Sequence, residues 1–594
     1  MRLLPRWAAL VCALLGTGAV SGPAQSNELT TLAERSGFQR TGRYEEVLRL
    51  CEVLPQRFPG RVLCLRFGVT PEGRPMTALV ASADGTVSPE VARQRHRPVV
   101  FLQAGIHAGE IDGKDAGLLV LRQWLTNPGD RSLHGTTVVL IPVLNVDGHE
   151  RFGPHQRPNQ AGPAETGWRT TAQNLNLNRD YAKADAPEMR ALLQLLQVWD
   201  PVLYADLHVT DGADFQPDVA VMVEPRHAGP EPLRRVARSL SDAVLQRLQG
   251  RGFRPLSFYP SFVREGDPTS GFAVGVPTPR FSTGYWPLRN RLAVLVETHS
   301  WKPYHRRVQA TAEVIRALVE QAASSGSSWL QAARAADEEA LHLGGQEVPL
   351  VFEHTEHAVP LRFPGFAYSQ EPSAISGALR IRYDRRRPQL WQVPLYNEVR
   401  AVVRTRAPRA GYLVPAAHAS WVGEKLRLHG IDVAPLRRSQ LLQVEAFRIH
   451  DKTFRSSPFE GRMTVSVRGT WQRERRELPV GSLFVPIAQR PAMLLVHLLD
   501  PLGPDSLLSW GFFNAHLEQK EYMEPYVAEE IAADMLARDP ALRAAFVRRL
   551  QHDAAFARDP AARLRFFHER HPSWDDRYDL YPILRTDDVP ALAP

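Results

Sequence analysis

Several features that often reveal a protein's environment are scarce or absent in this sequence. Beyond its first 26 residues the chain has no apolar run of about 18 residues, so we expect no membrane-spanning helix in the mature protein. Lysine is rare, because 6 Lys and 66 Arg make up the 72 basic residues, and the arginines form neither a block nor a stripe. A net charge of +8 scattered in this way argues against a nucleic-acid surface.

Two widespread hydrolase signatures are missing as well. The sequence has no H-E-x-x-H, in which two histidines one helical turn apart bind zinc. It also has no G-x-S-x-G, the turn that carries the nucleophile of many serine hydrolases. A serine-hydrolase site and a zinc site built on one helix are therefore not predicted.

Cysteine is scarce too, with three residues, and Cys12 lies in the apolar stretch of the N-terminus without a lipoprotein context. Residues 1–24 combine an Arg-containing start, an apolar stretch and small residues, the pattern of a secretory signal peptide. We therefore expect export to the periplasm or the extracellular space. Outside the cytosol, Cys51 and Cys64 can form a disulfide, and a pair of buried thiols is the open alternative.

The length of 594 residues is too great for one hydrophobic core, so we expect two domains after the signal peptide, 27–325 and 335–594. The first alternates apolar strands with helical segments, which predicts an α/β fold: a mostly parallel mixed sheet with helices on both faces. Asp185 is the expected N-cap of one of these helices. A Ser/Gly-rich stretch within 320–346 marks the expected boundary, and the remainder predicts a mixed α+β region, strand-rich and then helical.

Polar residues with metal-binding or catalytic chemistry stand where the expected strands of the first domain end. They are His107, Glu110, Asn145, Asp147, His208 and Glu297. Ligands of an open parallel sheet bind beyond the carboxyl ends of its strands, so these side chains are expected to converge. Two histidines and a glutamate are a ligand set that zinc uses in catalytic sites, and a further carboxylate can serve as a proton acceptor.

The chain from about residue 40 to 322 resembles the zinc carboxypeptidase family in an ordered set of motifs. "GIHAGE" is similar to that family's H-x-x-E ligand pair, and "ADLHV" to the strand with the third ligand. "NVDG" resembles its N-P-D-G turn, and "GWR" with "NLNLNRDY" resembles the segment that binds the substrate's terminal carboxylate. "VLVETHS" is similar to the strand with the catalytic glutamate. H-x-x-E alone is a weak signal, but the five motifs in order are specific.

The resemblance implies a role for each matching position. His107, Glu110 and His208 would bind one Zn²⁺ in the catalytic domain, and Glu297 would be the general base and then the general acid. Arg169 would stabilise the tetrahedral oxyanion. Asn178 and Arg179 would hold the free C-terminal carboxylate of a peptide or peptide-like substrate.

The chain departs from the family pattern at two positions. Asn176 replaces an Asp that orients a zinc-binding imidazole, so the amide can still accept the ring N–H but adds no charge. Gly275 stands where the family has a mobile Tyr, and Tyr285 is offered as a substitute substrate-binding residue. His354 and His357 lie beyond the expected boundary in a charged run, and a solvated loop is the preferred interpretation.

The sequence thus predicts an exported zinc metallocarboxypeptidase. Two alternatives remain open at this stage. One is a zinc amide hydrolase of the same fold that acts on N-acyl amino acids or cell-wall peptides. The other is a binding protein that has kept the fold without catalysis. No feature of the sequence predicts side-chain specificity or a role for residues 335–594.

Overall fold

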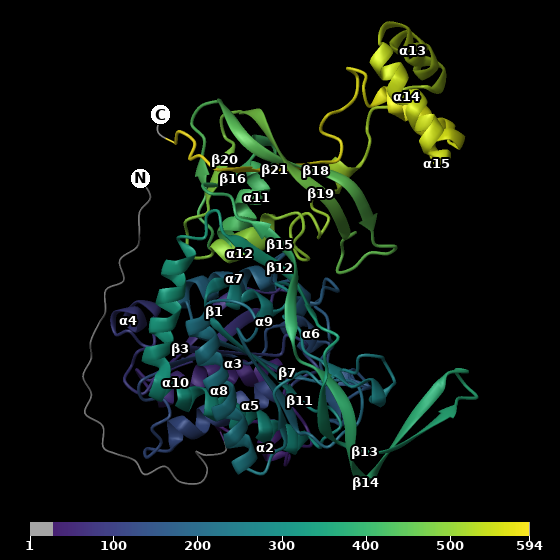
Figure 1. The fold of residues 1–594 in the computed structure, drawn as a ribbon. Coiled ribbons are helices and arrows are strands. Elements are labelled where there is room, and N and C mark those ends of the chain that lie inside the picture. Colours follow the sequence, from purple (N-terminus) through teal and green to yellow (C-terminus); the bar gives the residue numbers. More distant parts are fainter. Residues whose placement is uncertain (1–27, 593–594) are drawn as a thin grey trace.

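A computed structural model describes residues 28–592, and the expected signal peptide lies outside the described residues. An eight-stranded sheet forms the centre of the N-terminal part (Figure 1). Its strands, in spatial order, are β1 (Val62–Val69), β2 (Pro75–Ala81), β4 (Thr137–Ile141), β3 (Val99–Ala104), β7 (Leu203–Val209), β11 (Leu292–Thr298), β8 (Val219–Glu224) and β9 (Pro255–Leu256).

The middle of this sheet is parallel and its flanks are partly antiparallel. Strands β4, β3, β7 and β11 run in one direction, so their carboxyl ends share an edge. Strands β1 and β2 form an antiparallel hairpin beside β4, and β8 pairs antiparallel with β11. The inner strands are buried along nearly their whole length, as expected when helices cover both faces. The predicted mixed α/β sheet is confirmed.

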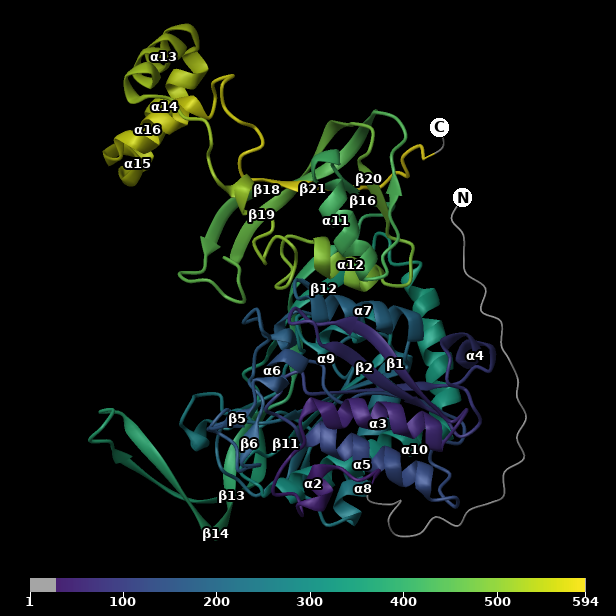
Figure 2. The same cartoon turned by 180° about the vertical axis from the view of Figure 1, so that it is seen from behind.

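Helices lie on both faces of the sheet, as Figures 1 and 2 show. One face is covered by α7 (Pro187–Trp199) with the short helix α9 (Ser282–Tyr285). The other face is covered by α3 (Tyr44–Arg57), α5 (Asp112–Thr126), α8 (Glu231–Gly250) and α10 (Tyr304–Ala340). Helix α7 begins at Pro187 with Ala186 as N-cap, so the expectation that Asp185 caps it is wrong.

The Ser/Gly-rich stretch was expected to lie outside helical structure, but helix α10 runs through it without a break. Gly326 lies against Pro98: a Cβ at this glycine would come within 2.6 Å of the proline Cβ. Trp329, one turn further, is buried. The stretch is therefore a site of close packing, where a small residue lets the helix approach the loop before β3, and α10 leads directly into the C-terminal part.

The C-terminal part contains a second sheet of six strands, above the first in Figure 1. Its strands, in spatial order, are β17 (Ala434–Pro435), β20 (Leu483–Pro486), β16 (Gly411–Val414), β21 (Leu580–Thr586), β18 (Gln440–Phe454) and β19 (Val465–Leu478). Helices α11 (Ala416–Leu428) and α12 (Ala492–Leu499) lie between this sheet and the first domain.

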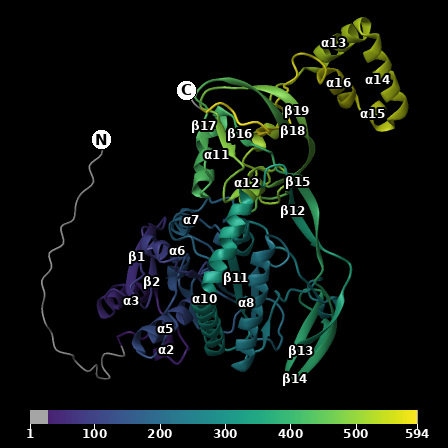
Figure 3. The ribbon, with the colours of Figure 1, turned by 60° about the vertical axis from the view of Figure 1, so that its left-hand side comes forward.

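Two further elements extend from the body of the molecule, as Figure 3 shows. The strands β13 (Val359–Pro372) and β14 (Leu379–Tyr396) form a long hairpin, and β12 (Glu347–His354) pairs with β15 (Val399–Arg406). Four helices form a separate lobe with its own small core. They are α13 (Pro525–Arg538), α14 (Pro540–His552), α15 (Ala554–Arg558) and α16 (Pro560–His568).

Cys51 and Cys64 form a disulfide with a Cα–Cα distance of 5.3 Å, which settles the alternative left open by the sequence. The bond joins α3 to β1 across 13 positions of the chain. Among the described helices, none combines the length and the hydropathy that crossing a bilayer requires.

Candidate active site

Three parallel strands bring the metal-binding candidates to one edge of the sheet. After β3, Gly105 adopts a left-handed φ of 62° and passes within 3.0 Å of the Val143 backbone, measured from where a Cβ would lie. This close turn directs His107 and Glu110 to the edge before α5 begins. His208 lies near the end of β7 and is the register partner of Glu297 on the adjacent β11.

The side chains of His107, Glu110 and His208 meet around one point. His107 Nδ1 lies 2.9 Å from Glu110 Oε1, and His208 Nδ1 lies 2.8 Å from Glu110 Oε2. One candidate ligand atom from each residue falls within 4.8 Å of the other two. All three residues are 3% exposed, so the cluster is shielded from bulk water. Two imidazole nitrogens and a carboxylate at this spacing fit the ligand set of a zinc site.

The outer nitrogen of each imidazole has its own polar partner. His107 Nε2 lies 3.0 Å from Oδ1 of Asn176, the neutral amide that stands where the family pattern has an Asp. That oxygen also accepts the Asn178 backbone N–H at 3.0 Å, which fixes the orientation of the amide. With Nε2 protonated and bonded to Asn176, the His107 Nδ1 lone pair faces the cluster, as a metal ligand requires.

Asp206 supplies the matching partner on the other side, and the sequence analysis missed it. Its Oδ1 lies 3.0 Å from His208 Nε2, and its Oδ2 accepts a hydrogen bond of 2.7 Å from Ser282 Oγ. Asp206 precedes His208 by two residues on a strand, so both side chains emerge on the same face. That spacing in "ADLHV" is the signal that could have identified it.

The charges around the cluster shift the pKa values of its members. Burial alone would raise the pKa of Glu110, but His107 and Arg157 outweigh it and hold the pKa well below the usual value. Arg157 Nη2 lies 3.1 Å from Glu110 Oε1. For His208, burial would lower the pKa, yet the carboxylates of Asp206 and Glu110 raise it well above the usual value. Glu110 is therefore the ionised centre of the cluster.

Glu297 is buried beside the cluster without a fixed partner. It is 8% exposed, and its Oε2 makes no hydrogen bond within residues 28–592. Burial raises its pKa to about 8, and the charges of Glu110 and Asp206 add to that rise while His208 opposes it. A carboxyl group with a raised pKa and a free oxygen is suited to proton transfer near neutral pH.

A cavity of about 470 Å³ opens over these residues, and Arg169, Asn178 and Arg179 line it with them. Arg169 Nη1 lies 3.3 Å from Glu110 Oε1. The Arg179 guanidinium lies over the Phe281 ring, 4.6 Å from its centroid, and burial lowers its pKa, with the like charge of Arg169 adding to the effect. The cavity thus combines a metal-type cluster, a free carboxyl group and three guanidinium groups, those of Arg169, Arg179 and Arg226.

Many residues that line the cavity were not identified in the sequence analysis, among them the titratable residues Tyr259 and Glu224. Tyr259 lines the cavity and is 38% exposed, and burial of its ring together with the charges of Glu297 and Asp211 raises its pKa. Glu224, at the end of β8, lines the cavity with an exposure of 8%. Both follow from the folding of loops and strand ends far from the recognised motifs.

Tyr285 is not a cavity residue, and its assignment to substrate binding is corrected. Its side chain is 1% exposed and packs against Tyr181 and Trp286. Its hydroxyl lies 2.9 Å from Nδ1 of His429, a residue of the C-terminal part. The phenol therefore joins the two parts of the molecule and is unavailable to a substrate.

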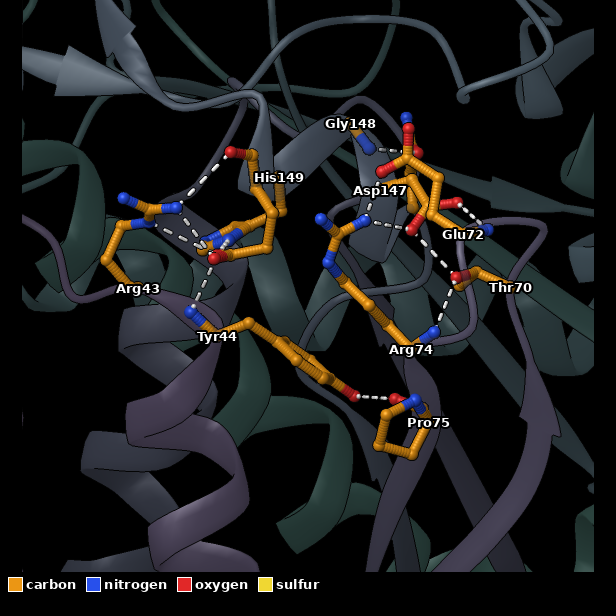
Figure 4. A network of polar contacts seen from close by, with 11 residues as sticks. Arg43, Tyr44, Thr70, Glu72, Arg74, Pro75, Asp147, Gly148 and His149 are labelled. Carbon is orange, nitrogen blue, oxygen red and sulfur yellow. Dashed lines mark hydrogen bonds and ion pairs between the residues drawn. The ribbon is translucent and has the colours of Figure 1, made fainter.

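Asn145 and Asp147, which follow β4, do not line the cavity, and Figure 4 shows the contacts of Asp147 with the β1–β2 hairpin. Asp147 accepts a hydrogen bond of 2.7 Å from Thr70 Oγ1 and forms an ion pair of 2.6 Å with Arg74, both from the β1–β2 hairpin. The Asn145 side-chain amide donates to the backbone carbonyl of Arg169 at 3.2 Å. Asn145 thus contacts the segment that carries Arg169, whereas Asp147 ties the turn after β4 to the β1–β2 hairpin.

His149, His354 and His357 lie away from the cavity lining. His149 is fully buried, and its Nδ1 lies 3.0 Å from Glu150 Oε1, which also binds Arg43 (Figure 4). His354 and His357 are exposed on the β12 strand end and the loop after it. Within the described residues, the cluster of His107, Glu110 and His208 is the one group of three or more ligand-type side chains close enough to hold a metal.

The comparisons with known proteins agree with this geometry. Residues 47–254, which include His107, Glu110 and His208, match the family model for zinc carboxypeptidase. Residues 47–254 are therefore a region of the zinc carboxypeptidase type, and this match, with the carboxypeptidase relatives, supports a zinc metallocarboxypeptidase as the class of the enzyme.

The relatives are distant. Carboxypeptidase 2 of Trichophyton tonsurans is 22% identical over 469 residues, which cover 74% of this chain and 78% of that protein. Carboxypeptidase D of Homo sapiens is 28% identical over 214 residues, 30% of this chain and 15% of that protein. Among solved structures, carboxypeptidase A of Helicoverpa armigera is 16% identical and covers 53% of this chain and 81% of that one, with a TM-score of 0.35. A metallo-carboxypeptidase of Pseudomonas aeruginosa is 16% identical and covers 48% and 69%, also with a TM-score of 0.35.

Proposed function

We propose that the protein is an exported enzyme that removes C-terminal residues from peptides by zinc-dependent hydrolysis. The observation that carries the proposal is the shared cavity, where the His107, Glu110 and His208 cluster lies beside Glu297, and which Arg169 and Arg179 also line. The cluster would hold one zinc ion through the inner imidazole nitrogens and the Glu110 carboxylate. Zinc, when bound, supplies a Lewis acid that polarises a carbonyl and lowers the pKa of water toward about 7.

Glu297 is assigned the proton transfers. Its carboxylate accepts a proton from the attacking water and then donates it to the amine of the leaving residue, so the group returns to its starting state. The free Oε2 and the raised pKa support this role, because the group can hold a proton near neutral pH. Its register position beside His208 keeps it next to the cluster.

The arginines are assigned to the two charges of the substrate complex. Arg169, next to Glu110, would stabilise the negative charge that develops on the carbonyl oxygen, since a guanidinium keeps its proton. Arg179 would pair with the free carboxylate of the last residue, with Asn178 as a neutral hydrogen-bonding partner. A requirement for a free C-terminus follows from this second pair.

Export and the domain division complete the proposal. Residues 1–24 have the signal-peptide pattern, and the Cys51–Cys64 disulfide supports an oxidising compartment. We assign the chemistry to residues 27–325 and an accessory role to residues 335–594.

The test compares one peptide with a free C-terminal carboxylate and the same peptide with a C-terminal amide. The proposal predicts sequential loss of C-terminal residues from the acid, mapped by mass spectrometry, and little or no cleavage of the amide. Equal cleavage of both would favour the alternative, a zinc amide hydrolase of the same fold that does not read the terminal charge. A protein that binds zinc yet hydrolyses neither peptide nor an N-acyl amino acid would revive the non-catalytic alternative.

A further inference from the structure

The turn between β18 and β19, residues 455–464, reaches from the C-terminal part to the segment that lines the active-site cavity. Glu460 Oε2 accepts a hydrogen bond of 2.8 Å from the backbone N–H of Asn176. A Cβ placed on the next residue, Gly461, would lie 3.7 Å from Leu175 Cδ2. The charge of Glu460 also acts on Arg179, since it opposes the lowering of the Arg179 pKa. The turn therefore lies against residues 175–179.

Glu460, which makes this contact, has a backbone conformation that is unfavourable for a residue other than glycine. Its φ is 50°, in the left-handed region that residues other than glycine avoid. Phe459 and Arg462 form an isolated bridge on either side of it, which defines a tight turn. A non-glycine residue persists in such a conformation when its surroundings determine it, and such residues concentrate at functional sites.

Polar and aromatic contacts hold the turn, and Asp185 and Arg280 are the partners that the first domain supplies. The guanidinium of Arg462 binds both oxygens of Asp185 at 2.6 and 2.9 Å. Phe459 is stacked on Trp510 with a centroid distance of 5.9 Å. Arg280 lies over both of these rings. The bidentate ion pair of Arg462 and the stacked ring of Phe459 thus hold the turn on either side of Glu460 and Gly461.

Asn176 connects the turn to the chemistry. Its backbone N–H is bound by Glu460, while its side-chain oxygen faces His107 Nε2 and the Asn178 N–H. A displacement of this residue would turn the His107 imidazole and shift Asn178 and Arg179, which line the cavity.

We propose that Glu460 is a positioning residue of the active site, through which residues 335–594 complete the substrate-binding and metal-binding geometry of the first domain. The predicted changes in KM and kcat rest on the proposed function. The predicted effect on the metal site does not depend on it. The C-terminal part is then a component of the catalytic unit, because Glu460, a residue of that part, supplies the acceptor for the Asn176 N–H.

The experiment uses the full chain with Glu460→Ala and the conservative Glu460→Gln, whose amide oxygen can still accept the N–H. Glu477→Ala, an exposed glutamate on β19 of the same hairpin, is the matched control. Three quantities are measured: zinc affinity by competition with a chelator, KM and kcat on a free-acid peptide, and hydrogen exchange of the peptide that contains Asn176.

For Glu460→Ala we expect faster exchange at residues 175–179, zinc affinity lower by about tenfold, and a KM increase of about tenfold that exceeds the change in kcat. Glu460→Gln should recover most of each loss, and Glu477→Ala should match the wild type. Unchanged exchange and unchanged zinc affinity in Glu460→Ala would overturn the inference. If the wild type hydrolyses no peptide, the proposed function fails, while exchange and zinc affinity still decide the positioning role. A global loss of folding would show as faster exchange in all core strands of Glu460→Ala, and this result would overturn a role confined to residues 175–179.

Discussion

Replacement of Glu224 by glutamine is predicted to stabilise the protein, and the gain should grow with pH. Glu224 is 8% exposed at the end of β8, and its Oε2 accepts the backbone N–H of Arg226 at 2.6 Å. Burial raises its pKa from 4.5 to about 7, and the Arg226 N–H and guanidinium offset only part of that rise. At about 1.4 kcal/mol per pKa unit, ionisation of the folded protein costs about 3 kcal/mol.

The sign follows from proton binding in the two states. Between pH 4.5 and 7 the unfolded chain has lost the Glu224 proton and the folded protein keeps it, so the wild type loses stability as pH rises. Above pH 7 the whole penalty is present. Glutamine has the same shape and no charge to bury. The free energy of unfolding of Glu224→Gln should therefore exceed that of the wild type by little near pH 5 and by up to about 3 kcal/mol near pH 8.

The assay is denaturant-induced unfolding of both proteins at several pH values from 5 to 8, in the same zinc buffer. Comparing the two proteins at each pH removes the shared pH dependence of metal binding. Glu90→Gln, which removes an exposed carboxylate on α4 (Pro89–Gln94), controls for the loss of one charge. A stability difference between Glu224→Gln and the wild type that stays constant across this range would refute the reasoning.

Three further predictions concern the site and its support. Asp206→Asn should lower zinc affinity by about 10- to 100-fold in a chelator competition, because it removes the charged partner of His208, and an unchanged affinity would count against that role. Arg179→Ala should raise KM for a free-acid peptide at least tenfold and reduce the preference for acid over amide, as measured by initial rates; an intact preference would place the carboxylate elsewhere. Replacing Cys51 and Cys64 together by serine should lower the free energy of unfolding by about 3 kcal/mol, as for a loop of this length, whereas no loss in denaturation would show that the bond adds no stability.

The fold of the first domain and the centre of the site could be predicted because local signals determine them. Buried strands read as apolar runs, and parallel strands bring their carboxyl ends together, so His107, Glu110, His208 and Glu297 converge without any knowledge of distances. The Asn176 contact with His107 joins residues 69 positions apart, and it could be expected only from the resemblance to the zinc carboxypeptidase family.

The features that escaped prediction depend on contacts between distant parts of the chain. Tyr285 was wrongly predicted to bind substrate. Its hydrogen-bond partner, His429, lies 144 positions away in the sequence, so no local signal indicated that its hydroxyl is already engaged. Glu460 lies 284 positions from Asn176, and nothing in its neighbourhood marks it as part of the site. The helix α10 crosses a Ser/Gly-rich stretch because Gly326 packs against Pro98, a tertiary contact that outweighs weak helix propensity.

The most direct test of the central claim is the hydrolysis rate of zinc-loaded Glu297→Gln, measured together with its metal content. Because Glu297 is assigned the proton transfers and His107, Glu110 and His208 the metal, we predict one zinc ion per chain and a rate roughly 10²- to 10⁴-fold below the wild type. A variant that keeps its zinc and hydrolyses the peptide at the wild-type rate would contradict the account.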